Sequence, residues 1–132
     1  MSIKVLLVED NAIAQKFSVF ILSAYQCEVD LARDGAEALS LLMQKKYDMI
    51  FVDYGLPDIT GSVLTKKIRE IKAFEKLPVI GLSAHDAKVN GVDYQHDYEQ
   101  ECLQAGMDVY MTKPLREEQV VELLKTYVPD KV

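Results

Sequence analysis

The amino-acid sequence predicts an α/β fold in which five parallel strands form a doubly wound sheet with five helices on its two faces. Two observations lead to this prediction. Five short apolar segments alternate along the chain with five amphipathic segments that have the spacing of helices. The apolar segments are nearly continuous and rich in β-branched residues, which is typical of parallel strands covered on both faces.

The first half of the chain contains three predicted strands and two predicted helices. The almost entirely apolar run Ile3–Val8 predicts the first strand, and Asn11 is a suitable N-cap for the helix that follows. The segment Glu28–Ala32 alternates like a second strand and is ended by Asp34-Gly35, and Met49–Val52 predicts the third strand. The apolar faces of the two helices are expected to consist of Ile13, Phe17, Phe20, Ile21 and Ala24, and of Ala36, Leu39, Leu42 and Met43.

The second half contains two further strands and three helices. A loop rich in Gly and Pro follows the third strand, over residues 54–61. The strands are Val79–Leu82, which Pro78 introduces, and Val109–Thr112, while the stretch from 84 to 95 has no period. Gly106 is expected to end the fourth helix. The helices are marked by Leu64, Ile68 and Ile71, by Tyr98, Cys102 and Ala105, and by Val120, Leu124 and Tyr127.

The size and composition of the chain limit the classes of protein to which it can belong. It has 132 residues, 49% of them hydrophobic, which suits a single globular domain over residues 1–132 rather than a disordered or fibrous chain. Its net charge of −6, from 15 basic and 21 acidic side chains, argues against direct nucleic-acid binding. No apolar run approaches the ~20 residues that cross a bilayer, and no signal peptide is recognised, so we expect a cytoplasmic protein without its own membrane contact. Cys27 and Cys102 have no partner at ligand spacing, so no zinc site is expected.

Polar and charged side chains follow four of the predicted strands, at the edge where open α/β sheets bind their ligands. These residues are Glu9 and Asp10 after the first strand, Asp53 after the third, Ser83 after the fourth, and Lys113 with Pro114 after the fifth. Three carboxylates in one pocket raise the pKa of at least one of them unless a cation joins them. Carboxylate oxygens in a water-accessible cleft suit Mg²⁺. A free carboxylate beside a metal, a hydroxyl and a lysine is an arrangement for phosphoryl transfer.

This constellation resembles the receiver domain of two-component response regulators. The resemblance runs from about Ile3 to Val128 and rests on the acidic pair Glu9-Asp10, the loop Asp53–Gly61, the Ser83-Ala84 step and Lys113-Pro114. It implies the flavodoxin/CheY-like fold with strand order 2-1-3-4-5.

The resemblance also implies a role for each matching residue. Asp53 is implied to be the phosphoacceptor, with Ser83 and Lys113 holding the phosphoryl group. The Mg²⁺ ligands are implied to be Glu9, Asp10, Asp53 and the backbone carbonyl of Gly55.

Two further expectations concern the switch and the turn before the last helix. Tyr110 falls on the aromatic switch position of the family and is expected to respond, with Ser83, to phosphorylation. The Lys113–Pro114 peptide is expected to be cis, because only X–Pro bonds adopt this form at low cost.

The implied partner is a histidine kinase or a histidine phosphotransfer domain, and a homodimer through the fourth helix, fifth strand and fifth helix is a further expectation. The Gly55–Asp58 form of the loop, followed by Gly61, resembles receivers of hybrid sensor histidine kinases. We therefore expect the segment to belong to a longer hybrid sensor histidine kinase, with which a membrane anchor outside this chain is compatible. A stand-alone or effector-linked regulator, or a docking module independent of phosphate, is the alternative. The resemblance implies that the domain catalyses its own phosphorylation and dephosphorylation. No kinase segment is recognised in this chain, which leaves its classification as an enzyme open.

Other functions fit the sequence less well. Glu9-Asp10 would repel the phosphate of a flavin, and no Gly-x-Gly-x-x-Gly follows a strand. Phosphatases with an aspartate nucleophile require paired aspartates on the first strand, and this strand has none.

Two positions and the length of one stretch depart from the common receiver pattern. Leu56 stands where Met is commoner, and Arg116 stands where a capping residue often opens the last helix. The stretch between Ser83 and Lys113 is longer than expected. The excess lies around Val89–Glu99, with Tyr94, His96 and Tyr98, and predicts either a longer exposed loop or an altered partner surface.

Overall fold

The computed structural model describes residues 2–83 and 88–131 and confirms the predicted sheet. Its five parallel strands have the order β2-β1-β3-β4-β7, which is the predicted order because β7 is the fifth strand of this sheet. The strands are β1 (Ile3–Val8), β2 (Cys27–Ala32), β3 (Met49–Asp53), β4 (Val79–Ser83) and β7 (Val109–Thr112).

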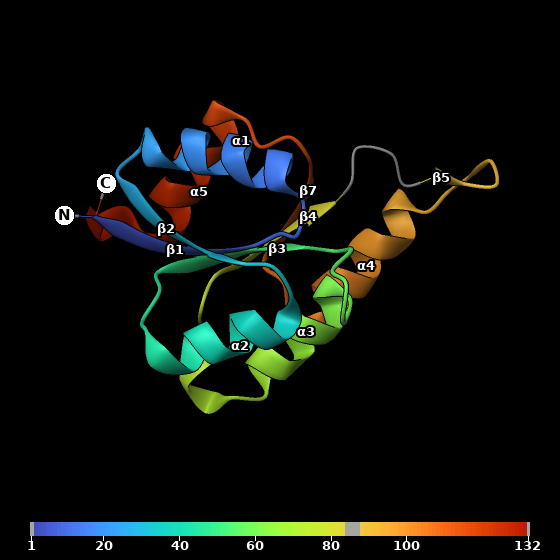
Figure 1. The fold of residues 1–132 in the computed structure, drawn as a ribbon, viewed down its shortest axis with the longest axis horizontal. Coiled ribbons are helices and arrows are strands. Elements are labelled where there is room, and N and C mark those ends of the chain that lie inside the picture. The colour runs from blue at the N-terminus through green and yellow to red at the C-terminus, as the bar shows by residue number, and fades with distance from the viewer. Residues whose placement is uncertain (1, 84–87, 132) are drawn as a thin grey trace.

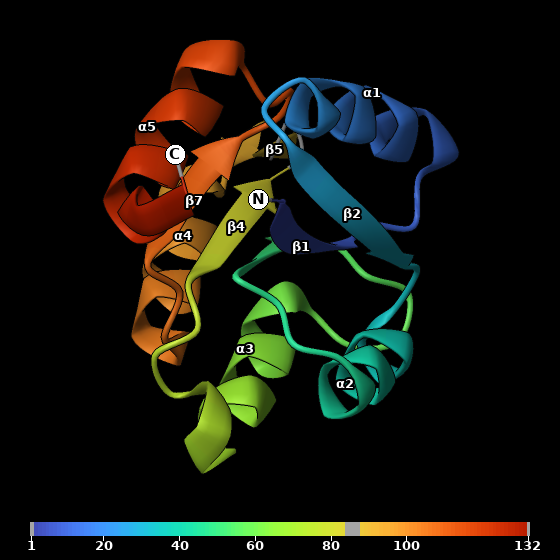
Figure 2. The same cartoon turned by 90° about the vertical axis from the view of Figure 1, so that its left-hand side faces the viewer.

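Five helices cover the two faces of the sheet, as predicted (Figures 1 and 2). They are α1 (Ala12–Ser23), α2 (Gly35–Gln44), α3 (Gly61–Arg69), α4 (Gln95–Ala105) and α5 (Glu117–Tyr127), with short 3₁₀ helices η1 (Lys72–Phe74) and η2 (Pro129–Lys131). The side chains of a strand alternate between its faces. Val5 and Leu7 of β1 therefore join the core under α1 and α5, while Leu6 and Val8 join the core under α2, α3 and α4.

The helix starts follow the expected chemistry. The Asn11 side chain accepts a hydrogen bond from the backbone N–H of Ala14 at 2.9 Å, which confirms it as the N-cap of α1. Arg116 does not cap α5 with its side chain. Instead, the side chain of Gln119 accepts a hydrogen bond from the backbone N–H of Arg116 at 3.1 Å.

Helix α1 buries a different face from the one its apolar spacing predicted. Ile13 and Phe20 are 80% and 74% exposed, whereas Ser18, Ile21 and Leu22 are buried. Because the core contacts are centred on Ile21 and Leu22, the helix is rotated about its axis by roughly one residue, or ~100°, relative to the prediction. An apolar stripe is left in solvent.

The extra residues after β4 form structure that the sequence pattern did not indicate. The short strands β5 (Lys88–Val89) and β6 (Val92–Asp93) pair antiparallel, and the hairpin extends beyond α4 (Figure 1). Asn90 and Gly91 have φ values of 51° and 81°, the left-handed backbone that a tight hairpin turn requires. Within the described residues, the excess consists of this hairpin, whose strand β6 is exposed, and the first turn of α4.

The two ends of the chain lie close together at the start of the sheet (Figure 1). The carboxylate of Asp48 accepts a hydrogen bond from the backbone N–H of Lys4 at 2.8 Å and from the Lys131 ammonium at 3.0 Å. Asp53 lies at the other end of the strands, as the last residue of β3. Within the described residues, no helix is long and apolar enough to cross a membrane.

Candidate functional site

The strand ends bring together the acidic residues that the sequence singled out. Glu9, Asp10 and Asp53 each place a carboxylate oxygen within 4.8 Å of the others. Lys113, which follows β7, forms ion pairs with Glu9 and with Asp53, the latter at 3.3 Å between Nζ and Oδ2. The peptide from Lys113 to Pro114 is cis, as predicted. Three carboxylates and one ammonium therefore form one cluster at the strand ends.

Burial strongly perturbs the Asp53 carboxyl. Its residue is only 6% exposed, and loss of hydration raises the pKa of its carboxyl to about 6 against the lowering effect of the Lys113 ammonium. The Glu9 carboxylate raises this pKa further. A cation bound beside Asp53 would therefore favour the ionised form of its carboxyl.

Glu9 is the most deeply buried acid, at 1% exposure. Its carboxylate pairs with Lys113 and accepts a hydrogen bond from the backbone N–H of Asn11 at 3.2 Å. The start of α1 therefore holds Glu9 in place. Asp10, by contrast, is exposed to solvent.

The donor set fits a magnesium ion. Mg²⁺ binds oxygen ligands, usually one or two carboxylates, and retains several waters. Three carboxylates with neighbouring oxygens, one of them open to solvent, meet that requirement. Gly55 lies in the loop two residues after Asp53, where a bridge to Thr60 closes the turn.

Ser83 and Tyr110 lie beside the acid cluster, on β4 and β7. Ser83 is 1% exposed and is one residue beyond Leu82, the register partner of Asp53. The Tyr110 hydroxyl is buried without a hydrogen bond of ordinary geometry within the described residues. Burial raises the pKa of Tyr110, and the nearby Ser83 side chain opposes this rise only in part. A Cβ at Gly81 would approach the Tyr110 ring to 2.7 Å, so the glycine leaves room for the ring against β4.

The sequence reasoning missed three contacts that α4 makes with residues of this site. The side-chain amide of Gln95 donates a hydrogen bond to Ser83 Oγ at 3.0 Å. The Tyr54 ring, directly after Asp53, stacks on Tyr98 with 4.4 Å between ring centroids. The hydroxyl of Tyr54 also donates to the Glu101 carboxylate at 3.0 Å. Aromatic residues at helical spacing after Ser83 were the available signal, and Ala84 lies outside the described residues.

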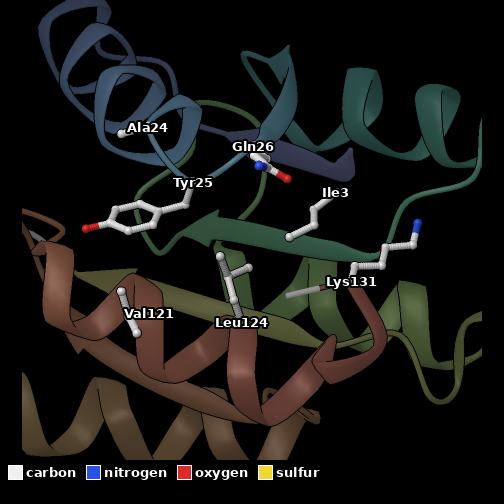
Figure 3. A pocket seen from close by; sticks show the side chains of 7 residues that line it. All are labelled: Ile3, Ala24, Tyr25, Gln26, Val121, Leu124 and Lys131. Atoms are coloured by element: carbon white, nitrogen blue, oxygen red, sulfur yellow. The ribbon is translucent and has the colours of Figure 1, made fainter. Parts of the chain in front are cut away.

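A separate pocket of about 370 Å³ lies at the opposite end of the sheet, between the end of α1 and α5 (Figure 3). Ile3 and Leu124 contribute apolar walls, and Lys131 at its edge is already paired with Asp48. Its lining lacks the acid cluster of the other edge, so we place the chemistry at the strand ends.

Comparison with known proteins agrees with this placement. A family model described as the response regulator receiver domain matches residues 5–125. The chain is 35% identical over 127 residues to the hybrid signal transduction histidine kinase L of Dictyostelium discoideum, covering 94% of this chain but 7% of that kinase. It is 29% identical over 130 residues to the polar-differentiation response regulator DivK of Brucella ovis, covering 98% of this chain and 99% of that protein.

A solved structure extends the comparison to the fold. The receiver domain of the sensor histidine kinase PA1611 from Pseudomonas aeruginosa matches with a TM-score of 0.82 and 29% identity, covering 98% of this chain and 99% of that one. That structure has a magnesium ion coordinated in its active-site cleft.

Proposed function

Because this chain belongs to the response regulator receiver family, we propose that it accepts a phosphoryl group on Asp53 and changes its partner contacts in response. The observation that carries the proposal is the buried Asp53 carboxylate, which is paired with Lys113 inside a cluster of acids. The single domain is proposed to span residues 1–132 and to act in the cytoplasm.

The residues of the site have distinct proposed tasks in the transfer. One carboxylate oxygen of Asp53 attacks the phosphorus of a phosphohistidine, so that a P–O bond forms as the P–N bond breaks and the imidazole leaves. The Lys113 ammonium, 3.3 Å from Asp53, offsets charge on the phosphoryl oxygens. The Ser83 hydroxyl donates a hydrogen bond to one of them.

Glu9, Asp10, Asp53 and the Gly55 carbonyl are the proposed ligands of Mg²⁺. When bound there, the ion would neutralise charge on the carboxylates and on the transferred group. The magnesium ion of the related receiver domain and the acid cluster support this assignment.

The exposed apolar face of α1 is the proposed docking surface for the donor. Ile13 and Phe17 are 80% and 44% exposed and line a groove of about 430 Å³ that continues to Lys113 and Pro114. Exposed apolar side chains beside a reactive site are typical of a protein interface. The proposed donor is a histidine kinase or histidine phosphotransfer domain whose helices cover this groove.

Output is proposed to run through the far edge of the sheet. A phosphoryl group that draws Ser83 toward Asp53 changes the space around Tyr110, and with it the surface of α4, β7 and α5. A shallow pocket of about 500 Å³ on β7 and α5, with Val109, Met111 and Tyr127 in its lining, supports a homodimer through this face.

The parent protein is proposed to be a hybrid histidine kinase, membrane-anchored or not. Three histidine kinases, two of them named as hybrid kinases, are 32–35% identical to the chain. The chain spans 7%, 7% and 5% of their lengths. The response regulator DivK, which the chain spans almost completely, supports a stand-alone regulator as the second candidate.

Acetyl phosphate labelling tests the central proposal. With Mg²⁺, intact-mass measurement should show one added phosphoryl group on the wild type and none on Asp53→Asn. Asp97→Asn, the same change at an exposed position of α4, is the control and should be labelled normally. Normal labelling of Asp53→Asn would overturn the proposal.

A further inference from the structure

The Ser83 side chain is hydrogen-bonded to the first residue of α4, a helix that is separate from the strand ends. Gln95, the first residue of α4, is twelve positions further along the chain, yet its side-chain nitrogen lies 3.0 Å from Ser83 Oγ. The same nitrogen lies 3.3 Å from Thr112 Oγ1 on β7. One amide therefore bridges the ends of β4 and β7.

The direction of this hydrogen bond matters for a hydroxyl group. A serine hydroxyl has one hydrogen to donate and two lone pairs to accept with. Since Ser83 Oγ accepts from the Gln95 amide, its hydrogen must point elsewhere. Ser83 is 1% exposed, so little competing water reaches it. The hydroxyl hydrogen is therefore left to be donated to an oxygen other than that of Gln95.

Gln95 is itself held on both sides. Its backbone N–H donates to the Asp93 carboxylate at 2.9 Å, which ties the start of α4 to the β5–β6 hairpin. One turn later, Tyr98 stacks between Tyr94 and Tyr54, with centroid distances of 6.0 and 4.4 Å. The helix that carries Gln95 is therefore fixed both to the hairpin and to the residue after the acceptor aspartate.

We propose that Gln95 is a positioning residue, whose amide orients the Ser83 hydroxyl toward the phosphoryl group and so couples the rate of Asp53 phosphorylation to the placement of α4 and the hairpin. This inference rests on the proposed function of Asp53. A partner that moves α4 would then change how fast the domain is labelled, without contacting the acid cluster.

Two substitutions of nearly equal size separate positioning from packing. Gln95→Met removes the donor and should slow labelling by acetyl phosphate about 3- to 10-fold, the range that one hydrogen bond of ordinary net strength supplies. Gln95→Glu should slow it further. A carboxylate only accepts hydrogen bonds, so it would turn the Ser83 hydrogen away from the phosphoryl group. Gln104→Met and Gln104→Glu, at an exposed position of the same helix, are matched controls and should label at the wild-type rate.

The measured quantities are the labelling rate at saturating Mg²⁺ and the melting temperature of the unlabelled protein. Positioning predicts the rate order wild type, Gln95→Met, Gln95→Glu. Wild-type rates in both Gln95 variants, or equal slowing in both that follows their melting temperatures, would overturn the inference. If the wild type and the Gln104 variants are not labelled on Asp53, the proposed function itself fails, which is a distinct result.

Discussion

Asp53, the proposed phosphoacceptor, lowers the stability of the folded protein when its carboxyl ionises. Its pKa is about 6 in the folded protein, against an ordinary value of 3.8, chiefly because burial removes its hydration. As pH rises from about 4 to 6, the Asp53 carboxyl ionises in the unfolded chain but stays largely protonated in the folded chain. The folded state therefore loses stability over this window, and the loss is complete above the folded pKa.

The first prediction follows from this sign. In protein stripped of divalent metal, Asp53→Asn should raise the free energy of unfolding at pH 7 by about 1–3 kcal/mol, and by much less at pH 4. Urea unfolding at the two pH values measures the difference. The exposed Asp97→Asn serves as reference and should change stability little at either pH. An equal gain for Asp53→Asn at pH 4 and pH 7 would show that ionisation is not the cause.

The second prediction concerns the proposed Mg²⁺ ligands. Asp10→Ala should weaken Mg²⁺ binding by at least ~10-fold, a loss that is common even for residues outside the direct ligand set. Glu9→Ala should weaken it less, because Glu9 already shares its charge with Lys113. Titration by tyrosine fluorescence, with Tyr54 next to Asp53, measures the affinity, and Asp97→Ala is the matched control. The same Mg²⁺ affinity in Asp10→Ala and wild type would refute the assignment.

At the scale of elements, one side chain of α3 connects this helix to three other segments: the end of α4, the η1 helix and the residues before β4. The Arg69 guanidinium, at the end of α3, donates to the carbonyls of Gly106, Phe74 and Leu77 at 2.9, 2.8 and 2.7 Å. It also pairs with Asp108 at 3.0 Å. A lysine could not reproduce this fork of donors.

The third prediction uses this contact. Arg69→Met should lower the free energy of unfolding by about 1–3 kcal/mol, since several acceptors lose a charged donor at once. Lys67→Met, an exposed position of the same helix, should stay within roughly ±0.5 kcal/mol. Urea unfolding compares the two, and similar losses would mean that Arg69 contributes only as a surface residue.

The elements themselves show what local pattern determines and what it does not. Strand ends were predictable, and so was the meeting of Asp53 with Lys113, because parallel register aligns residues that directly follow buried runs. The rotation of α1 was not, since Phe17 and Phe20 fit a helical stripe as well as Ile21 does and only tertiary packing chooses between them. The contact of Gln95 with Ser83 could not be predicted without the hairpin, for which the Asn90-Gly91 pair is a local turn signal.

At the scale of the whole molecule, the exposed face of α1 supplies the fourth prediction. Phe17→Ser should slow phosphoryl transfer from a phosphohistidine domain that labels the wild type, because the donor loses apolar contact area beside Lys113. Labelling by acetyl phosphate, which needs no docking surface, should be unchanged. Val63→Ser on α3, where Val63 is 41% exposed, is the control. Equal transfer rates in Phe17→Ser and wild type would place the donor on another face.

The pairing of Lys4 and Lys131 with Asp48 has a consequence for tethering. A globular domain of 132 residues has a radius of gyration of about 14 Å and hence a length of roughly 35 Å. Any segment continuing from either end starts on the side remote from Asp53 and must span about that distance, or roughly 11 extended residues. Shorter linkers would exclude transfer within one chain and favour transfer between chains, whereas longer ones would set the effective concentration of donor at the acceptor.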